Sequence, residues 1–157
     1  GEIGDARGEV VAALAAATAG DDHDVAYSAV AALLRFGPGA AAACPALVRL
    51  VPRPGRDEGR RGNGGEVPSL AVWALAVIDP EGHRELILAA CPGFLTRDPK
   101  NVMPMFYAVH ALGELKGSPR DAVALLVPVV DDPTLPEHLH ELAAKRVRDL
   151  PDAGLPV

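Results

Sequence analysis

Only a few side chains in this sequence have the chemistry of a metal site. His138, His140 and Glu141 form a short fragment of side chains that could be zinc ligands. Residues i and i+2 of a helix point to different faces, so the two imidazoles are not expected to converge on one ion. The acidic run Asp21–Asp24 is typical of a helix N-terminus, where carboxylates accept backbone N–H bonds. We therefore predict no metal, with a weak cation site at the acidic run as the alternative.

Nucleophilic side chains are equally scarce. Cys44 and Cys91 are the two cysteines, and each stands directly before a proline at a matching place along the chain. That match favours small buried residues over a catalytic thiol or a disulfide. His110 lies in an apolar stretch, which predicts a packed or half-exposed structural histidine rather than a base. The glycines of 62–65 follow no strand and fit no nucleotide-binding fingerprint. The sequence therefore predicts no catalytic residue, no cofactor and no enzymatic activity.

Aromatic and basic residues could in principle contact nucleic acid. Trp73, Phe106 and Tyr107 lie in apolar stretches, so we expect them in the core rather than in a platform that stacks on bases. Segment 53–65 is rich in arginine and glycine, but Asp57 and Glu58 dilute its positive charge. This composition predicts a flexible, solvated loop. A contact between this loop and an acidic partner is the alternative.

The elements that must position these residues follow a repeated pattern, Ala-x-x-Ala-Leu-x-x followed by a large apolar residue. Copies begin at Ala29, Ala71 and Ala108, and a weaker copy begins at Ala143. The spacing of roughly 35 to 42 residues is typical of helical solenoids, in which stacked units build one continuous core.

Each copy of the pattern predicts a helical hairpin. The pattern has the apolar spacing of a helix, and turns rich in glycine and proline follow it. The predicted first helices are Asp24–Phe36, Val67–Ile78, Asn101–Leu115 and Pro136–Leu150. The predicted second helices are Asp5–Thr18, Ala40–Val51, His83–Leu95 and Pro119–Val130, the last three with internal prolines at Pro45, Pro92 and Pro128. We find no strand pattern and predict an all-α fold, an α-solenoid of about four helical-hairpin repeats.

The bulk composition limits the classes of function. The chain has 157 residues, which suits one helical-repeat domain spanning residues 1–157, and its net charge is −6. That charge argues against nucleic acid or an anionic membrane as partner. A membrane-spanning helix needs about 20 consecutive apolar residues, and every apolar run in this sequence is much shorter. With no signal segment and only two cysteines, we expect a cytoplasmic protein.

The repeated pattern, with a proline early in first helices at Pro68, Pro104 and Pro136, resembles HEAT repeats. The similarity covers nearly the whole chain and includes the short bacterial form called the phycobilisome-lyase-type repeat. The Asp and Arg pair usual between neighbouring HEAT units is not regular here, so armadillo repeats stay open as an alternative. The resemblance implies a scaffold for a partner, and it implies neither catalytic residues nor bilin chemistry.

We expect the second helices to form the partner-binding face, because they are apolar nearly all round. Their predicted outward residues are Ala42, Ala46, Arg49, Glu85, Ala89, Asp121, Ala124 and Leu125. The first hypothesis is a non-enzymatic scaffold that binds another protein or a second copy of the chain. One alternative is a nucleic-acid-acting HEAT-like protein of the alkylpurine-glycosylase type, which needs a basic channel with aromatic residues. Another is a regulatory or assembly piece of a larger protein, because the first predicted unit has only its second helix.

Overall fold

Every element of the computed structural model, which describes residues 2–52, 65–95 and 102–151, is a helix. The helices are α1 (Glu2–Ala17), α2 (His23–Phe36), the 3₁₀ helix η1 (Gly37–Ala43), α3 (Cys44–Leu50), α4 (Glu66–Ile78), α5 (Arg84–Phe94), α6 (Met103–Gly113), α7 (Pro119–Asp131) and α8 (Glu137–Asp149). The all-α prediction is confirmed for these ranges, and the predicted helices are present with bounds that differ by a few residues. Most of the predicted loop, residues 53–64, lies outside the described ranges.

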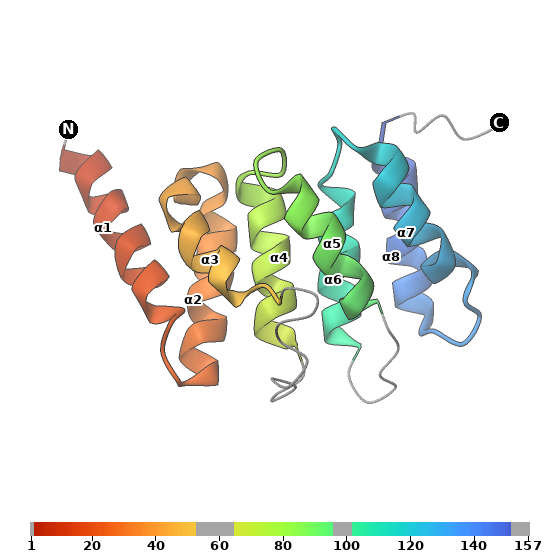
Figure 1. Ribbon diagram of the computed structural model, residues 1–157, viewed down its shortest axis with the longest axis horizontal. Coiled ribbons are helices and arrows are strands. Elements are labelled where there is room, and N and C mark those ends of the chain that lie inside the picture. Colours follow the sequence, from red (N-terminus) through yellow and green to blue (C-terminus); the bar gives the residue numbers. More distant parts are fainter. Residues whose placement is uncertain (1, 53–64, 96–101, 152–157) are drawn as a thin grey trace.

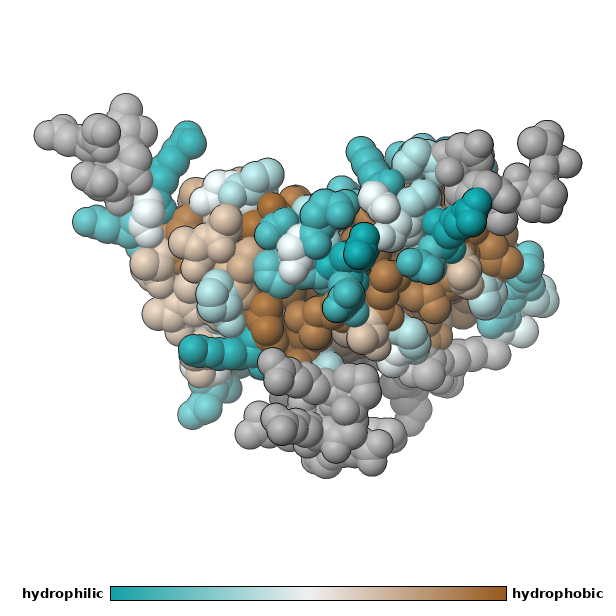
Figure 2. All heavy atoms as spheres, turned by 45° about the horizontal axis from the view of Figure 1, so that its top comes forward, coloured by the Kyte–Doolittle hydropathy of each residue, from teal (hydrophilic) through white to brown (hydrophobic). Residues whose placement is uncertain are grey.

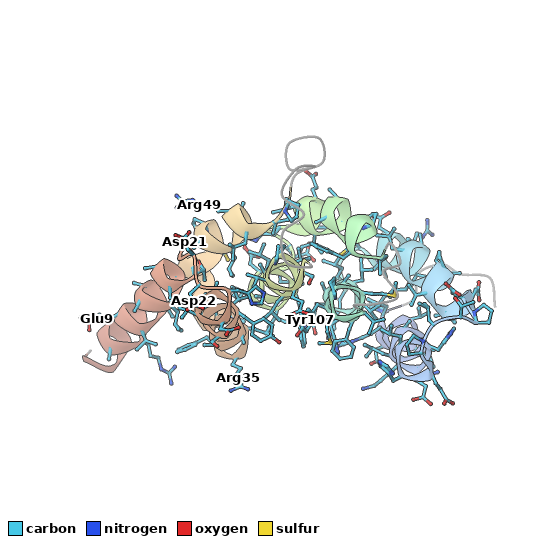
Figure 3. All side chains as sticks on the ribbon, turned by 90° about the horizontal axis from the view of Figure 1, so that it is seen from below. Glu9, Asp21, Asp22, Arg35, Arg49 and Tyr107 are labelled. Carbon is cyan, nitrogen blue, oxygen red and sulfur yellow. The ribbon has the colours of Figure 1, made fainter. Side chains whose placement is uncertain are left out.

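The helices form two layers (Figure 1). α2, α4, α6 and α8 lie side by side and run in the same direction, and we call them the first-helix layer. α1, α3, α5 and α7 lie in front of them, with η1 leading into α3, and form the second-helix layer. Figure 3 shows that the two layers curve gently, with the first-helix layer on the inner side of the curve. The contacts of α4 with α6 and with α2 are the most extensive in the described structure, and α6 also contacts α8, so this layer is continuous from α2 to α8.

Local signals set the ends of the helices. Asp22 caps α2, because its Oδ1 accepts hydrogen bonds from the backbone N–H groups of Asp24 (2.9 Å) and Val25 (3.2 Å). The prediction that the acidic run is a helix N-cap is therefore confirmed. Gly37 ends α2 with φ of 61°, a left-handed backbone that glycine adopts without strain. Gly65 precedes α4 with φ of 69°.

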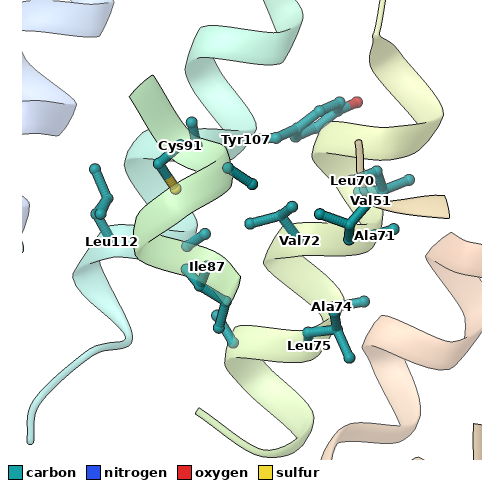
Figure 4. Close-up of a cluster of buried hydrophobic side chains, with 14 of the residues drawn as sticks. Val51, Leu70, Ala71, Val72, Ala74, Leu75, Ile87, Cys91, Tyr107 and Leu112 are labelled. Atoms are coloured by element: carbon teal, nitrogen blue, oxygen red, sulfur yellow. The ribbon is translucent and has the colours of Figure 1, made fainter. Parts of the chain in front are cut away.

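The core is centred on α4, which packs against α2 and α6 in its own layer and against α3 and α5 in the other. Val72 and Leu75 of α4 belong to one buried cluster with Ile87 of α5 and Leu112 of α6 (Figure 4). The first alanine of each repeated pattern is buried as well: Ala29, Ala71, Ala108 and Ala143. Alanine at these positions lets neighbouring helices approach closely, which explains why the pattern repeats.

The prediction of an internal proline in three second helices is wrong for Pro45. Segment 40–51 is not one helix: η1 runs to Ala43 and α3 begins at Cys44, so Pro45 lies in the first turn of α3. Proline is tolerated there because the first N–H groups of a helix have no helical partner. Pro92 of α5 and Pro128 of α7 lie inside their helices, as predicted.

One stretch of the described chain, His23–Leu50, is long and apolar enough to cross a membrane by length and composition alone. It is not one straight helix, because it comprises α2, η1 and α3 and the chain turns at Gly37 from one layer into the other. Val30 and Leu33 of α2 are fully buried inside the protein. Buried helices inside folded proteins can be equally long and apolar.

Candidate functional site

The predicted partner-binding residues lie on the outward side of the second-helix layer. Ala42 is on η1, Ala46 and Arg49 are on α3, Glu85 and Ala89 are on α5, and Asp121, Ala124 and Leu125 are on α7. All of them are exposed except Ala46 and Leu125, which are half-buried. On the inward side of segment 40–51, Cys44, Leu47 and Val51 are buried and Leu50 is half-buried. Figure 2, which views this layer obliquely, shows apolar atoms at the surface between polar side chains. That the outward side binds a partner stays a prediction.

A shallow apolar hollow of about 290 Å³ opens between α5 and α7. Pro92 and Leu95 line it next to α5, and Leu125 and Pro128 line it from α7. Its one acidic lining residue is Asp132, directly after α7. α5 and α7 contact each other far less than α4 and α6 do, so the second-helix layer is open here. Apolar side chains of a bound molecule could enter between the two helices.

A second cluster lies on the first-helix layer, and the sequence analysis did not predict it. The aromatic cluster comprises Tyr27 of α2, Trp73 of α4, and Phe106, Tyr107 and His110 of α6. The Trp73 ring stacks on His110, with ring centroids 4.3 Å apart, and on Tyr107 at 5.8 Å. Phe106 meets Tyr107 and His110 edge-on. The hydroxyl oxygens of Tyr27 and Tyr107 are 2.5 Å apart, a hydrogen bond that joins α2 to α6 across α4. The cluster therefore holds three helices together.

The aromatic cluster is packed rather than open. Tyr107 is buried, as predicted, but Trp73 and Phe106 are only half-buried at the edge of the core, so the prediction that they are core residues holds in part. The indole Nε1 of Trp73 is buried and has no hydrogen-bond partner among the described residues. Burial, followed by the hydrogen bond to Tyr27, raises the pKa of Tyr107 well above its ordinary value. These rings stack on one another, which fits a structural role better than base stacking.

His110 is held as a neutral imidazole. Burial first, and then the positive charges of Arg146 and Lys145, lower the pKa of His110 to about 4. The Nη2 group of Arg146 donates to His110 Nδ1 at 2.6 Å, which places the ring proton on Nε2. Nη1 of Arg146 lies 3.7 Å from the Glu114 carboxylate. The prediction of a structural histidine agrees with this geometry, because the ring is tied down on two sides.

The other candidate residues have structural surroundings. His140 donates from Nδ1 to the carbonyl oxygen of Val130 (2.9 Å), which ties α8 to α7, and His138 is exposed. Cys44 and Cys91 are free and buried; burial raises the pKa of Cys91 to about 12 and that of Cys44 in the same direction. Only a thiolate is a strong nucleophile, so neither thiol is activated. Within the described ranges, no three His, Cys, Asp or Glu side chains gather as metal ligands would.

A positional signal for the aromatic cluster is present in the sequence. Two residues after the first alanine of the repeated pattern stand Ala31, Trp73, His110 and Lys145. Two residues before it stand Tyr27, Ser69, Phe106 and Glu141. Residues at one register position of parallel neighbouring helices lie in a row, so rings at these positions predict contacts between helices. Ser69, at this position of α4, is buried, and its hydroxyl donates to the backbone carbonyl oxygens of Gly65 and Glu66.

Comparisons with known proteins do not narrow the function. No family model, no curated protein and no solved structure matches this chain. What the protein binds is therefore inferred from its own surfaces.

Proposed function

We propose that this protein is an α-solenoid of HEAT-like or armadillo-like repeats, with about four helical hairpins, that acts as a non-enzymatic scaffold for a protein partner. The support comes from register: the first alanine of the pattern is buried in each of α2, α4, α6 and α8. Each first helix also packs on the next one, as units of a solenoid do.

The second-helix layer is the surface we propose for the partner, and the hollow between α5 and α7 is the observation that carries the proposal. Apolar side chains of the partner would be buried against Leu125 and the two exposed prolines, Pro92 and Pro128. The exposed Glu85 and Asp121 would form part of a polar rim around this apolar centre. A second copy of the chain is one partner that this surface fits.

The experiment compares the double variant Ala46→Glu, Ala124→Glu with the wild type. Each carboxylate would need to be desolvated in the complex, so we expect the variant to fold normally and to lose its partner. Circular dichroism checks folding, and quantitative affinity purification with light scattering measures association. Lys145→Glu, on the exposed side of α8, changes the net charge by the same amount and is the control.

Retained association in a folded double variant would contradict the proposal. Unfolding of the double variant would mean that the face packs inward. The nucleic-acid alternative is separated by titrating single-stranded and duplex DNA at low salt, where an electrostatic binder is strongest. Binding of DNA by the wild type that survives Ala46→Glu and Ala124→Glu would favour that alternative.

A further inference from the structure

The first helices α4 and α6 bury the same four register positions. The first and last of these positions are also buried at α8, as Leu139 and Leu150, whereas α2 exposes three of the four. Counted from the first alanine of the pattern, these positions are four and one residue before it and three and seven residues after it. They are Val67, Leu70, Ala74 and Ile78 in α4, and Pro104, Tyr107, Ala111 and Leu115 in and directly after α6, and all of these are buried. In α2 they are Val25, Ser28, Ala32 and Phe36. Val25 is 48% exposed where Val67 is 8% exposed, and Phe36 is 37% exposed where Ile78 is 5% exposed.

This difference has one geometric explanation. α4 packs against α2, and α6 packs against α4, so each has a preceding first helix beside it. α2 has α4 on one side and contacts α1 of the second-helix layer, but no first helix precedes it among the described residues. The exposed positions of α2 therefore face the place that a preceding first helix occupies in the later units.

A hollow of about 510 Å³ lies along this side of α2. It is lined by Tyr27, Ser28, Ala31, Ala32, Arg35 and Phe36, of which Arg35 is the one charged residue. Val25 is exposed one helical turn before Ser28 and outside this lining. We call the surface formed by Val25, Ser28, Ala32, Arg35 and Phe36 the α2 groove. Large apolar side chains exposed to this degree are rare among the described residues, and Val10 of α1, at the same end of the stack, is a further example at 46%.

The opposite end of the stack is different. Within residues 102–151 no further first helix follows α8, which carries the exposed charged residues Glu141, Lys145 and Arg148. A polar outer face is what keeps the terminal unit of a helical stack in water. The α2 groove has an apolar face instead, which marks an interaction surface.

We propose that the α2 groove binds one amphipathic helix of a protein partner, lying parallel to α2. The packing of α2 on α4 and of α4 on α6 shows how such a helix would bind. In α4 and α6 the four register positions lie on the side of the preceding first helix. The matching donor positions in α2 are Val30, Leu33 and Leu34, which are buried or half-buried beside α4. The bound helix needs apolar residues spaced i, i+3 and i+4, and an acidic residue that meets Arg35. This surface is separate from the second-helix layer, so each proposal can fail alone.

The experiment titrates the folded protein into a fluorescein-labelled synthetic helix and follows anisotropy. The probe carries residues 23–36 of this chain with Arg35→Glu, so that it presents the donor positions, lacks the positive charge that would repel Arg35 of the protein, and has acidic groups at positions 24 and 35. We expect saturable binding by the wild type, and binding weakened at least about tenfold by Val25→Glu or Phe36→Glu. Val127→Glu on α7, at a position that is 39% exposed, is the matched control and binds like the wild type. The Ala46→Glu, Ala124→Glu variant also binds the probe.

Several outcomes would overturn the α2 groove as a helix-binding site. Absence of saturable binding by the wild type is one, and equal binding by all variants is another. If light scattering shows a dimer that Val25→Glu dissociates, a second copy covers the groove instead of a partner helix. Val25 lies in the first turn of α2, where a negative charge is favourable, so Val25→Glu stays folded even if Phe36→Glu does not.

Discussion

His110 illustrates how the surroundings of one residue fix its protonation state. The ring is stacked on Trp73, meets Phe106 edge-on and accepts a hydrogen bond from Arg146. An accepted bond at Nδ1 and a nearby guanidinium both disfavour the imidazolium ion, and burial acts in the same direction. The same ring in water would titrate near neutral pH.

We predict that this histidine makes stability depend on pH. The pKa of His110 is about 4 in the folded protein, against about 6.5 for an ordinary histidine in the unfolded chain. Between these pH values the unfolded chain binds a proton at His110 and the folded protein does not. The contribution of neutral His110 to the free energy of unfolding is therefore fully present above about pH 6.5 and falls as the pH drops toward 4. The variant His110→Gln has no titrating group at this position. We therefore expect the melting temperature of the variant to fall less between about pH 7.5 and about pH 5 than that of the wild type. Parallel melting curves for the two proteins would contradict the assignment.

That His110 is structural could be predicted from its apolar neighbours, but its partner could not. Arg146 is 36 residues away in the sequence and replaces the second alanine of the repeated pattern, so the sequence alone indicates only a weak copy. The contact depends on how far α8 lies from α6, which the pattern does not give. Burial of Cys44 and Cys91 was predictable, because their equivalent positions in the repeat require small apolar residues.

At the scale of helices, the contact between α6 and α8 depends on a glycine. The side chain of Arg146 crosses α6 at Gly113 on its way to His110 and Glu114, and a Cβ at Gly113 would lie 2.4 Å from the Arg146 Cδ. A larger residue would push the arginine side chain away. The irregular copy of the pattern on α8 is therefore matched by a small residue on α6.

We predict that the effect of Gly113→Ala on the free energy of unfolding depends on whether Arg146 is present, which a double-mutant cycle measures. Gly113→Ala costs about 1 kcal/mol in the wild type, because Arg146 must leave its hydrogen bond to His110. In an Arg146→Ala background the same change is neutral or stabilises by up to about 1 kcal/mol, because alanine favours a helix. Urea unfolding of the four proteins measures both values. Equal costs in the two backgrounds would show that the arginine does not need the glycine.

The helices themselves were largely predictable, since most have an apolar stripe and are followed within a few residues by glycine or proline. The segment before α3 was not. Gly37-Pro38-Gly39 is followed by a run of alanines that could continue as one α-helix, yet residues 37–43 form η1 and Ala40 has non-helical angles, φ −96° and ψ 18°. The two glycines and the burial of Ala40 and Ala43 decide this, and burial depends on the neighbouring helices.

The molecule as a whole is built from contacts between successive helices, with α4 and α6 most heavily packed. In the part of the chain that the structure describes, the helix at each end of the stack has neighbours on one side only. We therefore predict a gradient of local stability, with the slowest amide hydrogen exchange in α4 and α6 and faster exchange in α1 and α8. Hydrogen exchange followed by mass spectrometry of peptides measures this directly. Uniform exchange along the chain would indicate one cooperative unit instead.

The bond between Tyr27 and Tyr107 also has a mechanical consequence. A stack of helices in which each helix touches only its neighbours can bend independently at each helix–helix junction. This hydrogen bond joins α2 to α6 across α4, on the inner side of the curve, so it resists bending at both the α2–α4 and the α4–α6 junctions. Straightening the stack would lengthen the hydrogen bond, and tighter bending would compress the aromatic rings of the cluster. We therefore expect the part from α2 to α6 to bend less easily than the junction of α6 and α8, which pack on each other less extensively and have no such bond spanning two junctions among the described residues.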